Sequence, residues 1–282
     1  MRWLAVVAMV LWLGAPAGAQ GLSGYGWASA GVHAALAQGW MSNLAPGEFG
    51  PGVGLTKAEA VAVLGRVAGW PADAGTPSLP FQDAAQVPPW AAGYMSQAYY
   101  AGWLHGVGGG QLAPNQSLTW ASLSVLAARA LELPAAPEGQ VASLLSKLPN
   151  GPATPAWAQQ AVAQLVQARL LAEPLLSSYQ PEAPVGRAAL AQFIYQVQQV
   201  MPDAMPGMAG SQVITGTVVA LAIPLSVTVR TPSGVQTIRL SAQASVVVGE
   251  LDATLADLQV GQTVSLLLNR GAVQRAILIQ VT

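Results

Sequence analysis

The chain has 282 residues, of which 52% are hydrophobic and only 8% are charged, and its formal net charge is −1. This composition argues against disorder, and the missing basic field argues against binding to nucleic acid or to an anionic membrane surface. With no cysteine and two histidines, disulfides, thiolate zinc sites, cysteine nucleophiles and lipid-modified cysteines are excluded, and we expect no metal or cofactor.

Residues 1–19 have the pattern of an export signal. A positive start at Arg2 precedes an apolar run from Trp3 to Leu13, and the small residues Ala17 to Ala19 form a cleavage site. The apolar run is shorter than the roughly 20 residues of a spanning helix, and no later stretch is long and apolar enough to span a bilayer. We expect an exported protein with no transmembrane anchor after cleavage; an uncleaved N-terminal anchor is the alternative.

Three similar stretches follow the signal. Equivalent tryptophans begin them, at offsets of 63 and 67 residues: Trp27, Trp90 and Trp157. The same offsets relate three prolines: Pro51, Pro114 and Pro181. Offsets shared by separate segments indicate an internal repeat, and we place the repeats at residues 20–72, 73–138 and 139–200.

Each repeat contains two helical patterns. Apolar residues spaced i, i+3, i+4, i+7 predict first helices over 28–35, 91–98 and 158–165, and second helices over 60–67, 123–130 and 190–197. Thr56 and Glu59 form a capping box before a second helix, whereas Thr119 lacks the glutamate and Gly186 replaces the threonine. Two helices cannot bury their own faces, so we expect the copies to pool their second helices or to pack end to end.

The second stretch resembles an S-layer homology (SLH) repeat. The resemblance is carried by Phe81-Gln82-Asp83, Trp90-Ala91, Tyr94, Gly102-Trp103, Leu112-Ala113-Pro114, Thr119 and Arg129, and by Thr56-Lys57-Ala58-Glu59 with Arg66 in the first stretch. It implies a three-pronged pseudo-trimer with a central three-helix bundle. It also implies binding of bacterial cell-wall secondary polymers, often pyruvylated, in grooves between the prongs. The family's Thr-Arg-Ala-Glu signature is altered at residues 119–122 and 186–189, so at most two grooves keep its cation.

The chemistry of an acidic sugar selects the candidate glycan-binding residues: Lys57, Arg187, Trp120, Trp40, Trp103 and Asp83. The carboxylate needs a cation, and the C–H faces of the sugar need flat apolar surfaces such as indole rings. Lys57 and Arg187 lie in the first turn of a second helix, where a cation opposes the dipole and free N–H donors favour anions. We interpret both as binding residues; ordinary solvated charges are the alternative.

The other candidates keep two interpretations each. Trp120 replaces the cation of its repeat and either stacks on sugar or fills the groove, and Asp83 either positions a turn or accepts sugar hydroxyls. Trp40 and Trp103 lie at equivalent turns, where packing of the turn competes with a groove-wall role. Other residues are expected to be structural: the repeat tryptophans as core, Arg66 and Arg129 as partners of carbonyls or carboxylates, and the two histidines as satisfied structural residues.

A linker over residues 201–210 leads to a β domain over 211–282. We predict strands at 213–221, 225–230, 235–240, 244–248, 260–268 and 273–281, with hairpin turns at 231–234 and 269–271 and a capped helical turn at 254–257. This pattern fits a small closed antiparallel barrel, OB-like in form. Few exposed aromatics or basic clusters occur in it, so we expect a structural or protein-docking module.

The sequence therefore predicts an α+β multidomain protein: a helical SLH pseudo-trimer followed by a small β-barrel. We expect a non-enzymatic, exported cell-surface protein held to anionic cell-wall polysaccharide, with the β domain displayed or docking a protein partner. Dinucleotide, Walker and nucleophile-elbow spacings are absent from the sequence. Two alternatives remain open: an enzyme accessory whose β domain binds substrate or a catalytic partner, and a scaffold that has lost its ligand.

Overall fold

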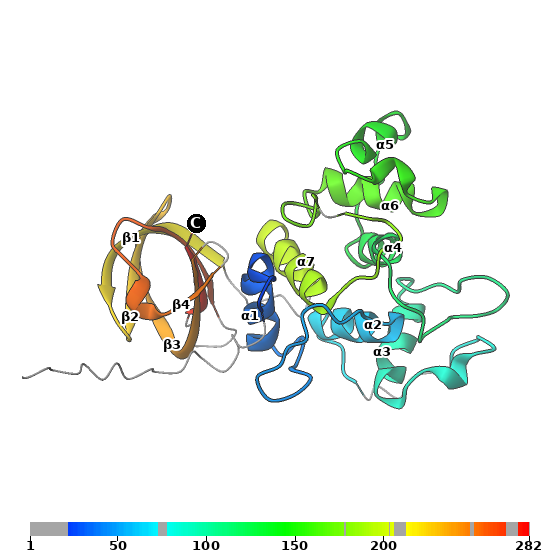
Figure 1. Ribbon diagram of the computed structural model, residues 1–282, viewed down its shortest axis with the longest axis horizontal. Coiled ribbons are helices and arrows are strands. Elements are labelled where there is room, and N and C mark those ends of the chain that lie inside the picture. The colour runs from blue at the N-terminus through cyan, green and yellow to red at the C-terminus, as the bar shows by residue number, and fades with distance from the viewer. Residues whose placement is uncertain are drawn as a thin grey trace, which may run out of the picture.

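The structure is a computed structural model that describes residues 22–72, 78–177, 179–202, 204–205, 213–248, 251–268 and 276–281. The predicted signal, most of the predicted linker and the turn at 269–271 lie outside the described residues. The described chain is α+β, with an N-terminal helical part and a C-terminal sheet (Figure 1).

Seven α-helices form the described helical part. They are α1 (Ser29–Ala37), α2 (Lys57–Val67), α3 (Pro89–Tyr100), α4 (Trp120–Ala130), α5 (Glu138–Leu145), α6 (Ala156–Gln167) and α7 (Arg187–Val200). Short 3-10 turns occur at η1 (Gly26–Ala28), η2 (Ala84–Gln86) and η3 (Gly151–Ala153). All six predicted helices are confirmed. Helix α5 was not predicted, because the repeat pattern supplies only two helices per stretch, although Val141, Leu144 and Leu145 keep helical apolar spacing.

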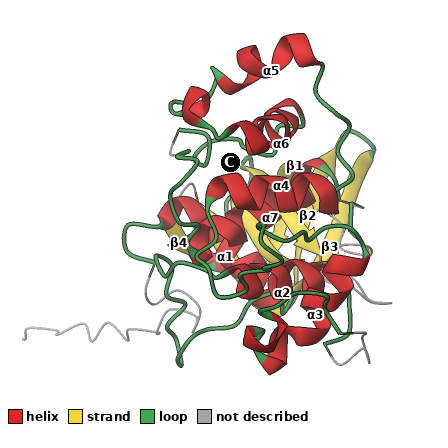
Figure 2. Ribbon diagram, turned by 90° about the vertical axis from the view of Figure 1, so that its right-hand side faces the viewer, coloured by secondary structure: helices red, strands yellow, loops and turns green. Residues whose placement is uncertain are grey.

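Each first helix packs against a second helix from another stretch of the chain. Helix α3 packs on α2, α6 packs on α4, and α1 closes the circle by packing on α7 (Figure 2). The second helices α2, α4 and α7 make their extended contacts with these partners and not with one another, unlike the three-helix bundle that the resemblance implies. Pairing across stretches buries faces that a single helical hairpin would leave exposed.

The segments that precede the second helices meet in a ring of main-chain hydrogen bonds. The N–H of Leu118 donates to the carbonyl of Leu55 at 2.8 Å, that of Val185 to Leu118 at 2.8 Å, and that of Leu55 to Val185 at 3.0 Å. These three buried residues stand at the offsets of 63 and 67 residues found in the sequence. The ring therefore relates the three stretches by an approximate three-fold arrangement.

The C-terminal part is a six-stranded sheet. Its strands are β1 (Val213–Ala222), β2 (Ser226–Thr231), β3 (Gly234–Val248), β4 (Leu251–Ala253), β5 (Thr263–Leu268) and β6 (Ala276–Val281), with the 3-10 turn η4 (Leu255–Asp257) before β5. The order is β2-β1-β5-β6-β3-β4, and β2 also pairs with β3. The pairs are antiparallel except for β3 with β6, which is parallel, so the expected purely antiparallel arrangement is wrong.

Several local predictions in the sheet are confirmed. Thr231 pairs with Gly234 across the predicted hairpin turn, and Thr254 with Asp257 forms the capping box of η4. The two strands predicted at 235–240 and 244–248 are one strand, β3, and β4 was not predicted. The closed barrel that the sequence predicts goes beyond this description of a six-stranded sheet.

The sheet docks on the α1–α7 pair. Ala30, Ala34 and Tyr195 form a buried cluster with Val247 of β3, and the Tyr195 hydroxyl donates to Gln280 Oε1 at 2.8 Å. Burial raises the pKa of Tyr195. The β domain is thus packed against the helical part, whereas the sequence predicted only a linker between them (Figure 1).

Candidate functional site

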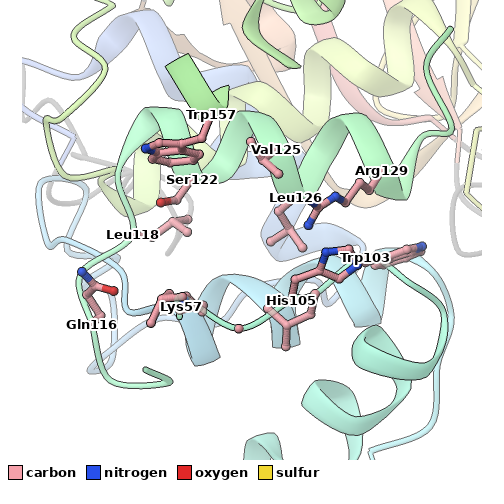
Figure 3. A pocket seen from close by; sticks show the side chains of 13 residues that line it. Lys57, Trp103, His105, Gln116, Leu118, Ser122, Val125, Leu126, Arg129 and Trp157 are labelled. Carbon is pink, nitrogen blue, oxygen red and sulfur yellow. The ribbon is translucent and has the colours of Figure 1, made fainter. Parts of the chain in front are cut away.

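A cleft of about 530 Å³ lies between α2, α4 and the loop that follows α3. Lys57 comes from the start of α2, Ser122, Leu126 and Arg129 come from α4, and residues 103–107 come from the loop. Trp157, at the start of α6, closes one end (Figure 3). The volume is in the range of small-molecule sites, and the walls come from all three stretches of the chain.

Lys57 lines this cleft but is tied to the fold. Its side chain is only 8% exposed, and Nζ donates to the carbonyl of Leu112 at 2.6 Å. Burial lowers the pKa of Lys57, and the charge of Asp83 opposes that shift. Lys57 therefore secures the loop that carries Leu112, and its hydrogen bond to this carbonyl competes with any ligand.

Asp83 secures the same loop from the other side. Its carboxylate accepts the N–H groups of Leu112 at 2.8 Å and Ala113 at 2.7 Å, and these hydrogen bonds lower the pKa of Asp83. Ala113 has a φ of 54°, a left-handed conformation that a residue with a side chain rarely adopts. Of the two interpretations of Asp83, its contacts match the positioning of a turn.

The N-termini of the second helices are capped by loops from a neighbouring stretch. In α2, the N–H groups of Lys57 and Ala58 donate to the carbonyls of Gln116 and Pro114, and that of Glu59 donates to Thr56. Helices α4 and α7 repeat the first two bonds: Trp120 to Ala183, Ala121 to Pro181, Arg187 to Val53 and Ala188 to Pro51. The N–H donors expected to be free for an anion are therefore already bonded.

Arg187, Trp120 and Trp40 do not line this cleft. Arg187 is 9% exposed, its Nε donates to the carbonyl of Phe49 at 2.8 Å and its guanidinium also donates to Ser42. The guanidinium lies 4.6 Å from the centre of the Phe49 ring. Trp120 and Trp40 are 5% and 2% exposed. These three side chains fill positions beneath loops, as Lys57 does.

Two tryptophans present indole surface to the cleft. Trp103, one of the predicted binding residues, is half-buried and stacks on Trp70 with ring centres 4.1 Å apart. Trp157 is 60% exposed, and Trp90 at the equivalent position is 50% exposed, so the prediction that they belong to the core is wrong. Each stands near the N-terminus of a first helix, where the helix pair ends and leaves one ring face open to solvent.

Arg129 is the accessible cation of the cleft. Its side chain is exposed and projects from α4 toward Trp103 and His105 (Figure 3). No hydrogen bond or ion pair joins the guanidinium of Arg129 to the part of the chain that the structure describes. Partial loss of solvent around the guanidinium lowers the pKa of Arg129, but the group stays charged at any physiological pH.

At the equivalent positions of the other two helix pairs, the side chain donates a hydrogen bond to a main-chain carbonyl. Arg66, 63 residues earlier, donates from Nη1 to the carbonyl of Trp40 at 3.2 Å and lies 5.7 Å from the Tyr94 ring centre. Gln196, 67 residues later, donates to the carbonyl of Arg169. The structural role expected of arginine at this position is confirmed for Arg66, but Arg129 has no such partner. Arg66 and Arg129 therefore differ in the groups that surround their side chains, and the sequence does not show which groups those are.

The chemistry of the cleft is basic and aromatic. Among the described residues, its titratable lining consists of Lys57, His105 and Arg129, without a carboxylate. A guanidinium beside indole rings suits a carboxylate carried on a flat apolar ring. In the described residues, no group of three His, Cys, Asp or Glu could hold a metal ion.

Sequence comparison identifies the segment that forms one wall of this cleft. Residues 80–119 match the family model of the S-layer homology domain. This S-layer homology segment contains α3, Asp83, Trp103 and the loop up to Thr119, and α4 with Arg129 follows it directly. No curated protein matches the chain.

S-layer homology domains bind cell-wall secondary polysaccharides, so the segment points to a cell-surface protein attached to the cell wall. None of the helices in the described ranges is long and apolar enough to cross a membrane.

Proposed function

We propose that the helical part attaches the protein to an anionic cell-wall polysaccharide, and that Arg129 in the α2–α4 cleft binds the sugar carboxylate. The observation behind this proposal is an exposed arginine, unpaired within the described residues, in a cleft that Trp103 and Trp157 also line, beside the S-layer homology segment. A charge-assisted hydrogen bond to guanidinium is among the stronger interactions available to a carboxylate. The two indoles supply apolar faces for the sugar ring.

Of the three equivalent positions in the helix pairs, we propose that one, at Arg129, binds the sugar carboxylate. Arg66 is held by the carbonyl of Trp40, and Gln196 carries no charge, so neither matches Arg129. In this account the predicted residues Lys57 and Asp83 shape the cleft from beneath its loop. Arg187, Trp120 and Trp40 do the same for the neighbouring loops.

A binding role is proposed in preference to catalysis. Glycoside hydrolysis generally requires two carboxylates on either side of the bond, and the lining of the cleft, as far as the structure describes it, contains only basic titratable groups. Export through the signal at residues 1–19, a location on the cell surface and a pyruvylated sugar as the ligand belong to the same proposal. A pyruvyl ketal supplies a carboxylate on a rigid sugar ring.

For the β domain we propose an OB-like barrel that serves as a structural module. Its support is that β2 pairs with both β1 and β3, while β1, β5, β6 and β3 are joined in sequence. The parallel pairing of β3 with β6 also fits this form. Packing on α1 and α7 favours a fixed module over a freely tethered one.

The test is co-sedimentation of the full chain with purified cell wall, before and after acid removal of the secondary polymer. We expect sedimentation with intact wall, none with stripped wall, and a loss of at least tenfold in affinity for Arg129→Ala. Arg230→Ala, which removes the same charge from the exposed surface of the β domain, is the matched control. Equal binding by wild type and Arg129→Ala would refute the assignment, and binding to stripped wall would refute the ligand class.

A further inference from the structure

His105 is a titratable side chain of the cleft that the proposed function leaves unused. It lies in the loop after α3, and the guanidinium of Arg129 points toward it (Figure 3). The imidazole is exposed and has no hydrogen bond or ion pair within the described residues, so His105 is not the satisfied structural residue expected from the sequence. Its repeat-equivalent residues are Ser42 and Ala172, and neither titrates.

The main chain on either side of the imidazole is fixed. Leu104, which precedes it, is only 4% exposed, and its N–H donates to a carbonyl in the last turn of α3 at 3.1 Å. Gly106, which follows it, is packed so closely that an added Cβ would lie 2.7 Å from the Phe81 ring and 2.8 Å from the carbonyl oxygen of Gln111. A side chain carried on fixed main chain loses less conformational freedom when it binds a ligand.

The charged groups that line the cleft with His105 are basic. Lys57 comes from α2 and Arg129 from α4. Two carboxylates on adjoining elements are directed elsewhere: Asp83 accepts main-chain N–H groups beneath the loop, and Glu132 lines a neighbouring hollow of the α4–α6 pair. A protonated His105 therefore adds a third positive charge to the cleft, and a carboxylate bound there offsets the repulsion.

A proton and a carboxylate thus favour each other at this position. A histidine ordinarily changes its charge between about pH 8 and about pH 5, whereas a carboxylate of ordinary pKa, about 4, stays mostly ionised in that range. Imidazolium donates a charge-assisted hydrogen bond, which is roughly twice as strong as a neutral one. By linkage, the factor by which protonation tightens sugar binding equals the factor by which the sugar tightens proton binding.

We infer that His105 is a second contact to the sugar carboxylate that acts only as imidazolium, so that attachment to the wall tightens as the pH falls from about 8 to about 5. The inference rests on the proposed function and adds the regulation of the same site, because the charge of Arg129 does not change over this range. Ser42 and Ala172 supply no such charge, which confines the pH dependence to the α2–α4 cleft.

The test is a calorimetric titration of the full chain with the methyl glycoside of a 4,6-pyruvylated hexose at about pH 5 and about pH 8. Wild type should bind about five- to tenfold more tightly at the lower pH. His105→Gln removes the charge and should bind at both pH values with about the wild-type affinity at the higher one. His105→Lys keeps a charge at both pH values and should bind about equally at the two, more tightly than wild type at the higher pH.

Two controls follow the charge and the proton separately. The methyl ester of the pyruvylated sugar has no charge and should bind weakly at both pH values. Titrations at an intermediate pH, in two buffers of different ionisation enthalpy, measure the protons taken up on binding. Wild type should take up a fraction of a proton, and His105→Gln should take up none.

Other titrating groups near the cleft are separated from His105 by the same variants. Burial lowers the pKa of Lys57, and Glu132 carries a carboxylate, a group that acid neutralises. Both are present in His105→Gln, so a pH dependence that this variant retains overturns the inference. Equal binding of wild type at the two pH values also overturns it and leaves the proposed function standing, whereas no binding at either pH overturns both.

Discussion

Gly31 lies where α1 meets α7, and its replacement by alanine tests how the circle of helix pairs is closed. A Cβ at this position would lie 2.5 Å from the Cα of Gln192 and 2.6 Å from its nitrogen, whereas ordinary contacts begin at 3.4 Å. The obstructing atoms are main chain, so no side-chain rotation relieves the clash. The N–H of Gly31 also donates to Gln192 Oε1 at 3.2 Å. Helix α1 must therefore shift by about 1 Å.

The magnitude follows from two opposing effects. Overpacking typically costs about 1–3 kcal/mol, and a backbone obstruction belongs at the upper end of that range. Alanine gains about 1 kcal/mol over glycine in helix propensity, which offsets part of the cost. The expected net loss in the free energy of unfolding is about 2 kcal/mol, or a fall in Tm of roughly 4–8 °C.

Denaturant and thermal unfolding followed by circular dichroism measure this change. Gly139→Ala is the matched control, because Gly139 lies in α5 and has no atom within 4 Å of the added Cβ. It should leave stability unchanged or raise it by up to about 1 kcal/mol. If Gly31→Ala is as stable as this control, the close contact between α1 and α7 is not present in solution.

Three further predictions address the cap, the loop and the domain contact. Thr56→Ala removes the capping box with Glu59 and should lower the free energy of unfolding by about 1 kcal/mol in chemical denaturation. The folded-state pKa of Asp83 is lowered, so its contribution is full above the unfolded pKa of about 4 and is lost as pH falls below it. Asp83→Asn should therefore flatten the acid limb of a stability–pH curve, and an unchanged curve would exclude the turn contacts. Tyr195→Phe removes the hydrogen bond to Gln280 and should cost about 1 kcal/mol, with faster amide exchange in α1 and β6; unchanged exchange would argue against the contact.

The helices were predictable because their apolar spacing survives in each stretch, whereas the main-chain ring was not predicted, although its residues stand at the same offsets. The partner of each helix was not predictable, since periodicity marks a buried face but not the surface that covers it. The docking of the β domain depended on Ala30, Ala34 and Tyr195, which read as an ordinary helix face in the sequence. The short α5 lies outside the two helices that the repeat pattern supplies in each stretch.

The candidate site was predicted less well than the fold. Trp103 and Lys57 line the cleft as members of the predicted set, but Lys57 is bonded to a carbonyl. The predictions assumed that a cation at a helix N-terminus faces a ligand, and the loops of neighbouring stretches occupy those ends instead. Arg129 and Arg66 both lie well inside a second helix, a position that predicts a structural role for each. Their difference lies in partners that are distant in the sequence.

A calorimetric titration of the full chain with a pyruvylated sugar glycoside, comparing Arg129→Ala with Arg66→Ala, measures whether Arg129 binds the carboxylate. We expect one ligand per chain, binding that survives Arg66→Ala, and a loss of at least tenfold in affinity for Arg129→Ala. Binding that survives Arg129→Ala, or a stoichiometry of three, would refute the assignment of the site to Arg129.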